Sequence, residues 1–384
     1  MAVPDWIWFG FIFAFGCCIG SFLNVVIYRL PRDESLIKPP SACPACGRGI
    51  QFYDNIPIVS WLLLGAKCRY CKAPISPRYF VIELLTGLVF VGMFFMFFNT
   101  DLRAGVGTFL ENGWFIYLTS IILLASLIAA SAIDMKLYVI PLSICWFATA
   151  TGLIRSALGV FVIDPAIIRS YSLLPSASAK TASLAAGAVI GLVISWGLLL
   201  TGLLKRSYDS EYYQDFPQEH EEAIEPTFNH RLEICREIIF LLPIIICSLA
   251  AGWLTRANPS IRIWWLDFSQ QPVIAGLLGS LWGYFVGCGI VWFARILGTL
   301  GFGKEAMGLG DVHLMGAAGT VIGAGLTVAA FFIAPFFGLA WAGLRAFFKK
   351  TRQIPYGPFL SLGVLTVMIL HDRILDYLYA IFYY

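Results

Sequence analysis

The sequence is poor in charged residues. Only 13% of its 384 residues are Asp, Glu, Lys or Arg, which is about half of the roughly 25% that is usual in soluble domains. Hydrophobic residues make up 59% of the chain, and the mean hydropathy is +0.79. Since so few charges cannot cover a soluble protein of this size, we predict an all-α polytopic membrane protein.

Several familiar motifs are also missing. The chain has no Gly-x-Ser-x-Gly elbow and no P-loop, which argues against a serine hydrolase and an ATPase. His220-Glu221-Glu222 is not the His-Glu-x-x-His of a metalloprotease. The first apolar segment lacks both a basic region before it and an Ala-x-Ala site, so it predicts an uncleaved anchor. The aromatic residues suit helices that face lipid, and no nucleic-acid partner is expected.

Long apolar runs account for the low charge. A run of about 20 residues crosses the roughly 30 Å of hydrocarbon in a bilayer. Ten runs predict about 8–10 transmembrane helices, and the eighth run is short enough to form a hairpin with the ninth. In chain order the runs are Trp6–Tyr28, Phe80–Phe98, Trp114–Ile133, Tyr138–Val160, Leu184–Leu204, Ile238–Leu254, Val273–Leu297, Val312–Ile322, Leu326–Ala346 and Pro358–Phe382.

The positions of Lys and Arg predict the orientation. Residues 29–78 hold eight basic residues, whereas residues 1–5 hold none, and basic loops stay in the cytosol. We therefore expect a cytosolic loop after the first span and an outer N-terminus. Strict alternation then places Lys205-Arg206, Lys304 and Lys349-Lys350 inside as well, while Arg256 and Arg262 fall outside and count against the rule.

The order of spans and polar stretches predicts four regions. Residues 1–99 hold the first span, a loop rich in Cys and Pro, and the second span. Residues 112–163 form a first catalytic block, and residues 272–384 form a second one. Residues 164–271 look like an insertion of two spans around an acidic stretch, Ser207–Glu237, which we expect to be a solvated cytosolic loop.

Four cysteines predict a metal site. Cys43 and Cys46, and then Cys68 and Cys71, form two C-x2-C pairs separated by 21 residues, a spacing close to that of a zinc ribbon. Four thiolates bind Zn²⁺ in a structural site. Zinc binding would stabilise the fold of a loop that is too small to bury a core of its own. Two disulfides are the alternative, but lasting disulfides are rare in the cytosol. The other cysteines read as small core residues: Cys17, Cys18, Cys145, Cys235, Cys247 and Cys288.

Two aspartates at span ends are candidate catalytic groups, because acidic residues at the edge of a bilayer helix are costly. Asp134 closes the third span, and Asp311 opens the eighth. Although they lie 177 positions apart, four crossings separate them, so both belong to the cytosolic edge. Gly308 and Gly310 lack side chains, which lets Asp311 approach the third helix closely and leaves room for an extended substrate.

Two adjacent carboxyls predict aspartic-protease chemistry. At about 4 Å and an effective dielectric near 20 their repulsion is roughly 4 kcal/mol, so one proton is shared. One carboxylate then activates water while the protonated one polarises the scissile carbonyl. Each residue also has a plainer interpretation: Asp134 pairs with Lys136, and Asp311 is the N-cap of the next helix. The occurrence of the pair on one face favours catalysis.

These residues resemble the type IV prepilin peptidase family, the GxGD-type membrane aspartic proteases. Gly308-Leu309-Gly310-Asp311 matches the catalytic signature of that family, and four further motifs follow in family order. These are Gly20–Pro31, the paired C-x2-C loop, Arg78–Glu83 and Ile354–Phe359. Two positions depart from the family pattern. Leu142 follows Pro141 where the family often has an acidic or amide residue. His313 stands where a lysine is common. His313 is either a plain helix-face residue or a titratable neighbour that shifts the pKa of the two carboxyls.

The resemblance to this family also implies a cellular location, a substrate and a second activity. It implies a bacterial inner-membrane endopeptidase that removes leader peptides from type IV prepilins or type II secretion pseudopilins on the cytosolic side. It assigns the chemistry to Asp134 and Asp311 and the metal to the four paired cysteines. Many members also methylate the new N-terminus with S-adenosylmethionine, an activity that belongs to the N-terminal region. Membrane lipid is the other expected partner, and the sequence predicts no oligomeric state.

Two other classes of protein remain open. A transporter or channel with a cytosolic zinc module would also be polytopic, but it would place its ionisable groups near the middle of the bilayer. A membrane methyltransferase without protease activity would keep the N-terminal region and lose an aspartate. This chain has both aspartates, which favours the peptidase.

Overall fold

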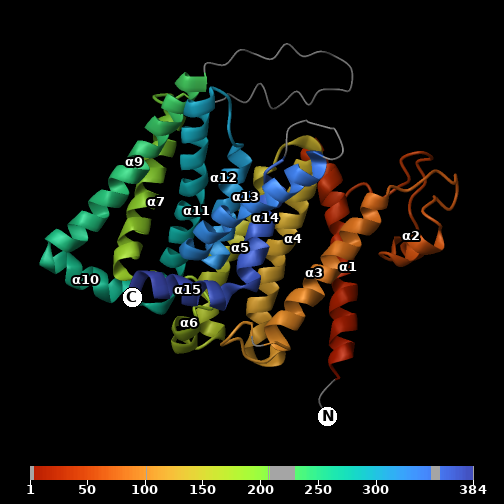
Figure 1. The fold of residues 1–384 in the computed structure, drawn as a ribbon, viewed down its shortest axis with the longest axis horizontal. Coiled ribbons are helices and arrows are strands. Elements are labelled where there is room, and N and C mark those ends of the chain that lie inside the picture. Colours follow the sequence, from red (N-terminus) through yellow and green to blue (C-terminus); the bar gives the residue numbers. More distant parts are fainter. Residues whose placement is uncertain (1–3, 101, 206, 208–229, 347–354, 384) are drawn as a thin grey trace.

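The computed structural model describes residues 4–100, 102–205, 207, 230–346 and 355–383. Within these residues the secondary structure is helical, apart from two isolated bridges, Ala42 with Gly49 and Lys67 with Pro74. The longer helices stand side by side as a bundle (Figure 1). In chain order the elements are α1 (Asp5–Arg29), η1 (Leu30–Arg32), η2 (Phe52–Asn55), α2 (Val59–Leu63), α3 (Pro77–Phe98), η3 (Phe109–Gly113), α4 (Trp114–Leu137), α5 (Leu142–Val162), α6 (Pro165–Tyr171), α7 (Ala179–Leu200), α9 (His230–Ala257), α10 (Pro259–Gln270), α11 (Pro272–Phe302), α12 (Leu309–Ile322), α13 (Ala324–Ala346), α14 (Gly357–Ile369) and α15 (His371–Tyr383).

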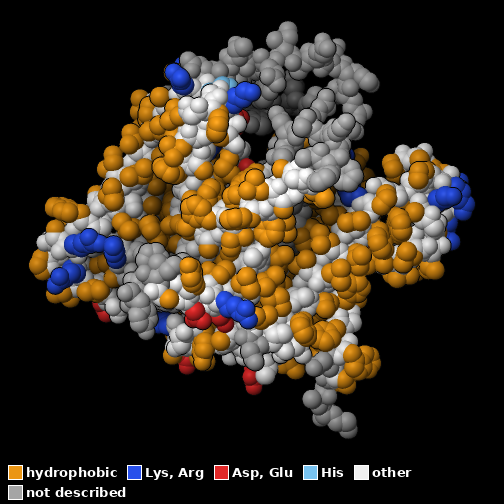
Figure 2. Space-filling model, viewed as in Figure 1, with side chains coloured by type: hydrophobic (Ala, Val, Ile, Leu, Met, Phe, Trp, Pro, Cys, Tyr) orange, Lys and Arg blue, Asp and Glu red, His pale blue; other side chains and the backbone are white. Residues whose placement is uncertain are grey.

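Eight of the described helices are long and apolar enough to cross a membrane, or nine if the bent pair α14 and α15 is one span. Hydrophobic side chains cover most of the flank seen in Figure 2, and Lys and Arg lie toward its edges and on the loop beside α3. The predicted class, an all-α multi-pass membrane protein, is confirmed.

Two of the ten expected spans differ from the expectation. The chain bends by 82° between Ile369 and His371, so the run Pro358–Phe382 is not one straight helix. The polar side chains of His371, Asp372 and Arg373 mark the break. The short run near Val312 is α12, whose 14 residues measure about 21 Å at 1.5 Å per residue, less than the hydrocarbon thickness of about 30 Å.

The core of the bundle lies around α4 and α12. Most of α4 is buried, whereas the residues along the apolar stretch of α9 are nearly all half-buried or exposed. In α12 every residue from Val312 to Val321 except His313 is buried. Small residues are frequent in both helices, Ala and Ser in α4 and Gly and Ala in α12, and small side chains let membrane helices pack closely.

The contact between α11 and α12 is a backbone contact. A Cβ added to Gly283 in α11 would lie 2.0 Å from the carbonyl oxygen of Gly319 in α12, and one added to Gly319 would lie 2.1 Å from the carbonyl oxygen of Gly283. Neither position therefore accepts a side chain without a shift of the helices. This contact fixes α12, and with it the depth of Asp311, against the longest helix.

The cysteine loop between η1 and α3 stands apart from the helices (Figure 1). It contains η2 and α2 and is stabilised by short-range hydrogen bonds rather than by a core. Arg69 pairs with Asp54 at 2.6 Å, and the guanidinium of Arg48 stacks 5.0 Å over the ring of Tyr70.

Some sequence predictions lie outside the described residues. They include residues 208–229, which make up most of the acidic stretch with His220-Glu221-Glu222, together with the basic residues Arg206, Lys349 and Lys350 and the first residue of the Ile354–Phe359 motif. For the end of that stretch the prediction of a solvated loop is wrong, because residues 230–237 begin α9 and bury Glu233 and Glu237.

Candidate active site

Asp134 lies in the last turn of α4. Its side chain is buried, with 6% of the residue exposed, and its Oδ2 accepts a hydrogen bond of 2.9 Å from the backbone N–H of Gly357. Gly357 opens α14, where the proline that follows suits the first turn of a helix. The carboxyl is thus held by a backbone donor from a segment 223 positions away.

Asp311 lies in the first turn of α12, and 7% of the residue is exposed. The backbone N–H of Gly308 hydrogen-bonds its carboxyl, as an acidic residue does in a capping box. Its Oδ1 is buried and has no hydrogen-bond partner among the described residues. A buried carboxyl oxygen without a partner is costly, and it is free to accept a bond from water or substrate.

Ile140 and two glycines bring the two carboxyls together. A Cβ on Gly310 would lie 2.7 Å from the Cβ of Ile140, and one on Gly357 would lie 2.8 Å from Oδ2 of Asp134. Both glycines therefore pack where a side chain would not fit. Asp134 and Asp311 are close enough for their charges to interact, so the structure places the predicted pair in one site.

Neither plainer interpretation of the aspartates holds in the form stated, although Asp311 still accepts a backbone N–H at the start of α12. Lys136 is exposed and makes no ion pair with Asp134 within the described residues. The N-cap of α12 is Gly308, not Asp311. The Nδ1 of His313 lies 3.1 Å from the hydroxyl of Tyr284, and its ring lies 5.4 Å from that of Trp146, contacts expected of a helix-face residue.

A buried ion network supports the loop before Asp311, and the sequence interpretation missed it. Arg295 in α11 is fully buried and forms a two-pronged ion pair with Glu237 of α9, the shortest contact being 2.9 Å. It also bonds Glu305 at 2.6 Å and the carbonyl of Met307. The signal was available, because a charged residue inside a predicted span has a role by default.

The four paired cysteines meet in the loop. The Sγ atoms of Cys43, Cys46, Cys68 and Cys71 all lie within 4.8 Å of one another, and those of Cys43 and Cys71 lie 3.8 Å apart. Zinc bonded to four sulfurs at about 2.3 Å in a tetrahedron requires sulfurs about 3.8 Å apart. All four are free thiols in the structure. The cluster therefore fits a Zn²⁺ ion.

The two halves of the cysteine loop repeat one turn. The N–H of Cys43 donates to the carbonyl of Arg48 at 2.9 Å, as that of Cys68 donates to Ala73 at 2.8 Å. Backbone N–H groups of Cys71 and Tyr70 lower the pKa of the Cys68 thiol to about 6. Burial and the neighbouring thiols raise the pKa of Cys71 to about 11, so the lowered pKa favours the metal-binding thiolate form at Cys68 first.

Two buried polar residues join this loop to the helices. Glu83 of α3 accepts a bond of 2.7 Å from the N–H of Ile58, which lies just before α2. Asn24 of α1 donates to the carbonyl of Tyr79 at 3.1 Å, and its Oδ1 has no hydrogen-bond partner among the described residues. The junction of α1, α3 and the loop is therefore a second polar site, separate from the aspartates.

Two family models match the chain. The bacterial peptidase A24 N-terminal domain matches residues 14–97, and the type IV leader peptidase family matches residues 239–343. The first range includes the four cysteines and the second includes Asp311, while Asp134 lies between them. No solved structure matches the chain.

Curated relatives cover more of the chain. A prepilin leader peptidase/N-methyltransferase of Aeromonas hydrophila is 28% identical over 74% of this chain and 82% of its own. That of Aeromonas salmonicida strain A449 is 31% identical over 55% of this chain and 70% of its own. One from Myxococcus xanthus is 44% identical, but the match spans only 35% of this chain and 36% of that protein. With both family models and these relatives in agreement, the chain belongs to the type IV leader peptidase family.

Proposed function

We propose that the protein is a membrane aspartic endopeptidase that removes the leader peptide of type IV prepilins or of type II secretion pseudopilins. One observation carries the proposal: two buried carboxyls, from the end of α4 and the start of α12, share one site, and an oxygen of Asp311 has no hydrogen-bond partner among the described residues. The names of the relatives support prepilins as the substrate.

The chemistry follows from the pair. One carboxylate takes a proton from a water, whose oxygen attacks the scissile carbonyl carbon. The other carboxyl, protonated, donates a hydrogen bond to the carbonyl oxygen and supports the negative charge that develops there. When the C–N bond breaks, the new amine takes up a proton, and the two carboxyls return to sharing one. The Gly357 N–H holds Asp134 in place during these steps.

We place the protein in the bacterial inner membrane with the site at the cytosolic face. The eight basic residues between 29 and 78 support this orientation, because Arg29 ends α1 on the side where the cysteine loop begins. Residues 112–163 and 272–384 form the two peptidase blocks, residues 1–99 the N-terminal region and residues 164–271 an insertion.

We also propose that residues 1–99 support methylation of the new N-terminus, as the names of the relatives indicate for those proteins. S-adenosylmethionine would supply the methyl group. Asn24 and Glu83 are the buried polar side chains where α1, α3 and the loop meet, and the free Oδ1 of Asn24 suits an ammonium donor such as a new N-terminus. A zinc ion held by the four cysteines would keep the loop folded.

The test is to co-express the protein with a prepilin from the same genome and to follow leader removal by intact mass. Asp134→Asn and Asp311→Asn should each abolish cleavage while the protein still inserts at normal levels. Asp267→Asn is the matched control, since Asp267 is exposed on α10. Cleavage that survives either catalytic-site substitution would refute the pair. An added methyl group in the same spectrum reports the second activity.

A further inference from the structure

A pocket opens at the end of the bundle opposite the aspartates. It has a cavity volume of about 370 Å³, within the range of about 300–1,000 Å³ that is usual for ligand sites. Its wall combines the end of α12 with the starts of α7 and α13 and two arginines, Arg103 and Arg155. We call it the Arg155 pocket.

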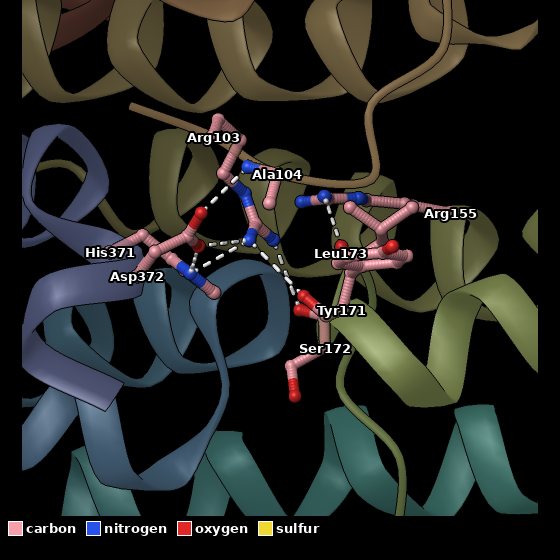
Figure 3. A network of polar contacts seen from close by, with 8 residues as sticks. All are labelled: Arg103, Ala104, Arg155, Tyr171, Ser172, Leu173, His371 and Asp372. Carbon is pink, nitrogen blue, oxygen red and sulfur yellow. Dashed lines mark hydrogen bonds and ion pairs between the residues drawn. The ribbon is translucent and has the colours of Figure 1, made fainter. Parts of the chain in front are cut away.

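Arg103 has a counter-charge in the protein. It lies between α3 and η3, and its Nη1 pairs with Asp372 of α15 at 2.8 Å. The same guanidinium bonds Nδ1 of His371 and the carbonyls of Tyr171 and Ser172 (Figure 3). This network joins three distant segments at the pocket and leaves its own charge balanced.

Arg155 has no such balance. Only 4% of it is exposed, and it donates to the carbonyls of Val321 and Leu173 at 3.1 Å each. None of the described residues offers it a carboxylate, and its buried Nε has no hydrogen-bond partner. The guanidinium of Arg103 is near enough to add repulsion (Figure 3).

A structural role for Arg155 is the competing explanation. Val321 lies in the last turn of α12, and the C-terminus of a helix carries about half a negative charge. That partial charge offsets only part of a full positive one. A buried ion without a counter-charge is costly, so an anion in the pocket would balance the charge that the helix end offsets only in part.

The rest of the wall also presents donors. The start of α13, at Ala324 and Gly325, lines the pocket, and the first N–H groups of a helix have no partner within it. The start of α7 adds Ser178 and Thr181. Helix starts and arginine together are the usual setting for phosphate. Apolar residues such as Trp282 and Phe97 complete the wall, which suits an amphiphile.

We propose that the Arg155 pocket binds a phosphate group, carried by a phospholipid headgroup or present as the free ion, with Arg155 as its charged donor. A lipid held here would join α5, α7, α12 and α13 at the membrane surface. The site is separate from the aspartates and does not depend on the proposed peptidase activity.

The test uses the full chain, delipidated in a nonionic detergent, and follows thermal unfolding by tryptophan fluorescence. One arm adds inorganic phosphate, with chloride at the same ionic strength as reference. The other adds phosphatidylglycerol, with diacylglycerol of the same acyl chains, which lacks the phosphate, as reference. Phosphatidylglycerol alone raising the melting temperature identifies a headgroup, and an equal response to inorganic phosphate identifies the free ion.

Two variants test the wall. Arg155→Gln should weaken the apparent affinity about tenfold or more, whereas Arg262→Gln, an exposed arginine of α10, should not. Should Arg155→Gln misfold, Thr181→Glu replaces it. Thr181 is three residues after the N-cap Ser178, where Glu completes a capping box and preserves the helix but brings a negative charge to the pocket. Thr181→Gln is its neutral control.

A response to phosphate or phosphatidylglycerol that is lost in Arg155→Gln or Thr181→Glu, and kept in the controls, supports the proposal. The proposal is overturned if neither compound shifts the melting temperature of the wild type. It is also overturned if all variants shift as the wild type does.

Discussion

Gly357 acts on Asp134 in two ways. Its N–H is the hydrogen-bond donor to the carboxyl, and its missing side chain makes room for Oδ2. At the scale of single residues, the position of this proposed catalytic carboxyl therefore depends on the absence of a Cβ at residue 357. The sequence motif around Ile354–Phe359 drew attention to this segment, but only the fold shows which side chain it contacts.

Gly357→Ala should displace Asp134. The added Cβ would lie 2.8 Å from Oδ2, and a shift of about 1 Å at a catalytic group can cost about 100-fold in rate. We expect kcat/KM for prepilin cleavage to fall by about that factor with normal insertion. Gly289→Ala in α11 is the control, because a Cβ there meets nothing within 4 Å. Equal activity of the two variants would contradict this account of Gly357.

At the scale of elements, an ion pair connects α9 to the loop that precedes Asp311. Glu237 of α9 binds Arg295 of α11, and Arg295 in turn holds the loop at Glu305 and Met307. Trp292 adds a third bond to Glu237, at 2.7 Å. A helix from the region predicted as an insertion thus supports the start of α12.

Glu237→Gln should destabilise the protein. Removing one member of a buried ion pair typically costs about 3–5 kcal/mol, whereas replacing both by apolar residues is often neutral. Glu237→Leu combined with Arg295→Met should therefore recover the melting temperature. The double variant should still cleave prepilin more slowly than the wild type, because Arg295 no longer bonds Glu305 and Met307 in the loop before Asp311.

Thermal unfolding and cleavage assays on the same samples separate these effects. Full cleavage by a stable double variant would show that Arg295 serves only stability. The network was hard to foresee in detail, because α9 and α11 are joined through α10 and no spacing rule predicts which faces meet. Arg295, a lone arginine within an apolar run, nevertheless indicated a buried ionic contact. Arg155 in another apolar run likewise indicated the Arg155 pocket.

At the scale of the whole molecule, the cysteine loop and the helices are stabilised by different means. The helices have a core of buried side chains, whereas the loop relies on short-range hydrogen bonds and a cluster of thiols. The four ligands followed from the sequence, because C-x2-C pairs are local patterns. Counting membrane crossings predicted that Asp134 and Asp311 lie at the same membrane depth. It could not predict the distance between their carboxyls.

Zinc removal should unfold the loop alone. We expect Cys46→Ser to abolish bound zinc, measured by elemental analysis of the purified protein, and to make residues 33–76 sensitive to protease. The melting of the helices should not change. Cys235, predicted as a core residue, is instead exposed on α9, so Cys235→Ser should keep the metal. Zinc retained in Cys46→Ser, or helices that melt with metal loss, would contradict a separate metal-dependent unit.

The unequal lengths of α11 and α12 have a consequence for how a cut site is chosen. α11 has 31 residues and α12 has 14, about 46 and 21 Å at 1.5 Å per residue, and α12 starts below the upper end of α11 (Figure 1). Asp311 is therefore recessed beside a taller helix. For a prepilin anchored in the same membrane, we therefore expect the height of the scissile bond above the anchor to help select the bond that reaches the two carboxyls.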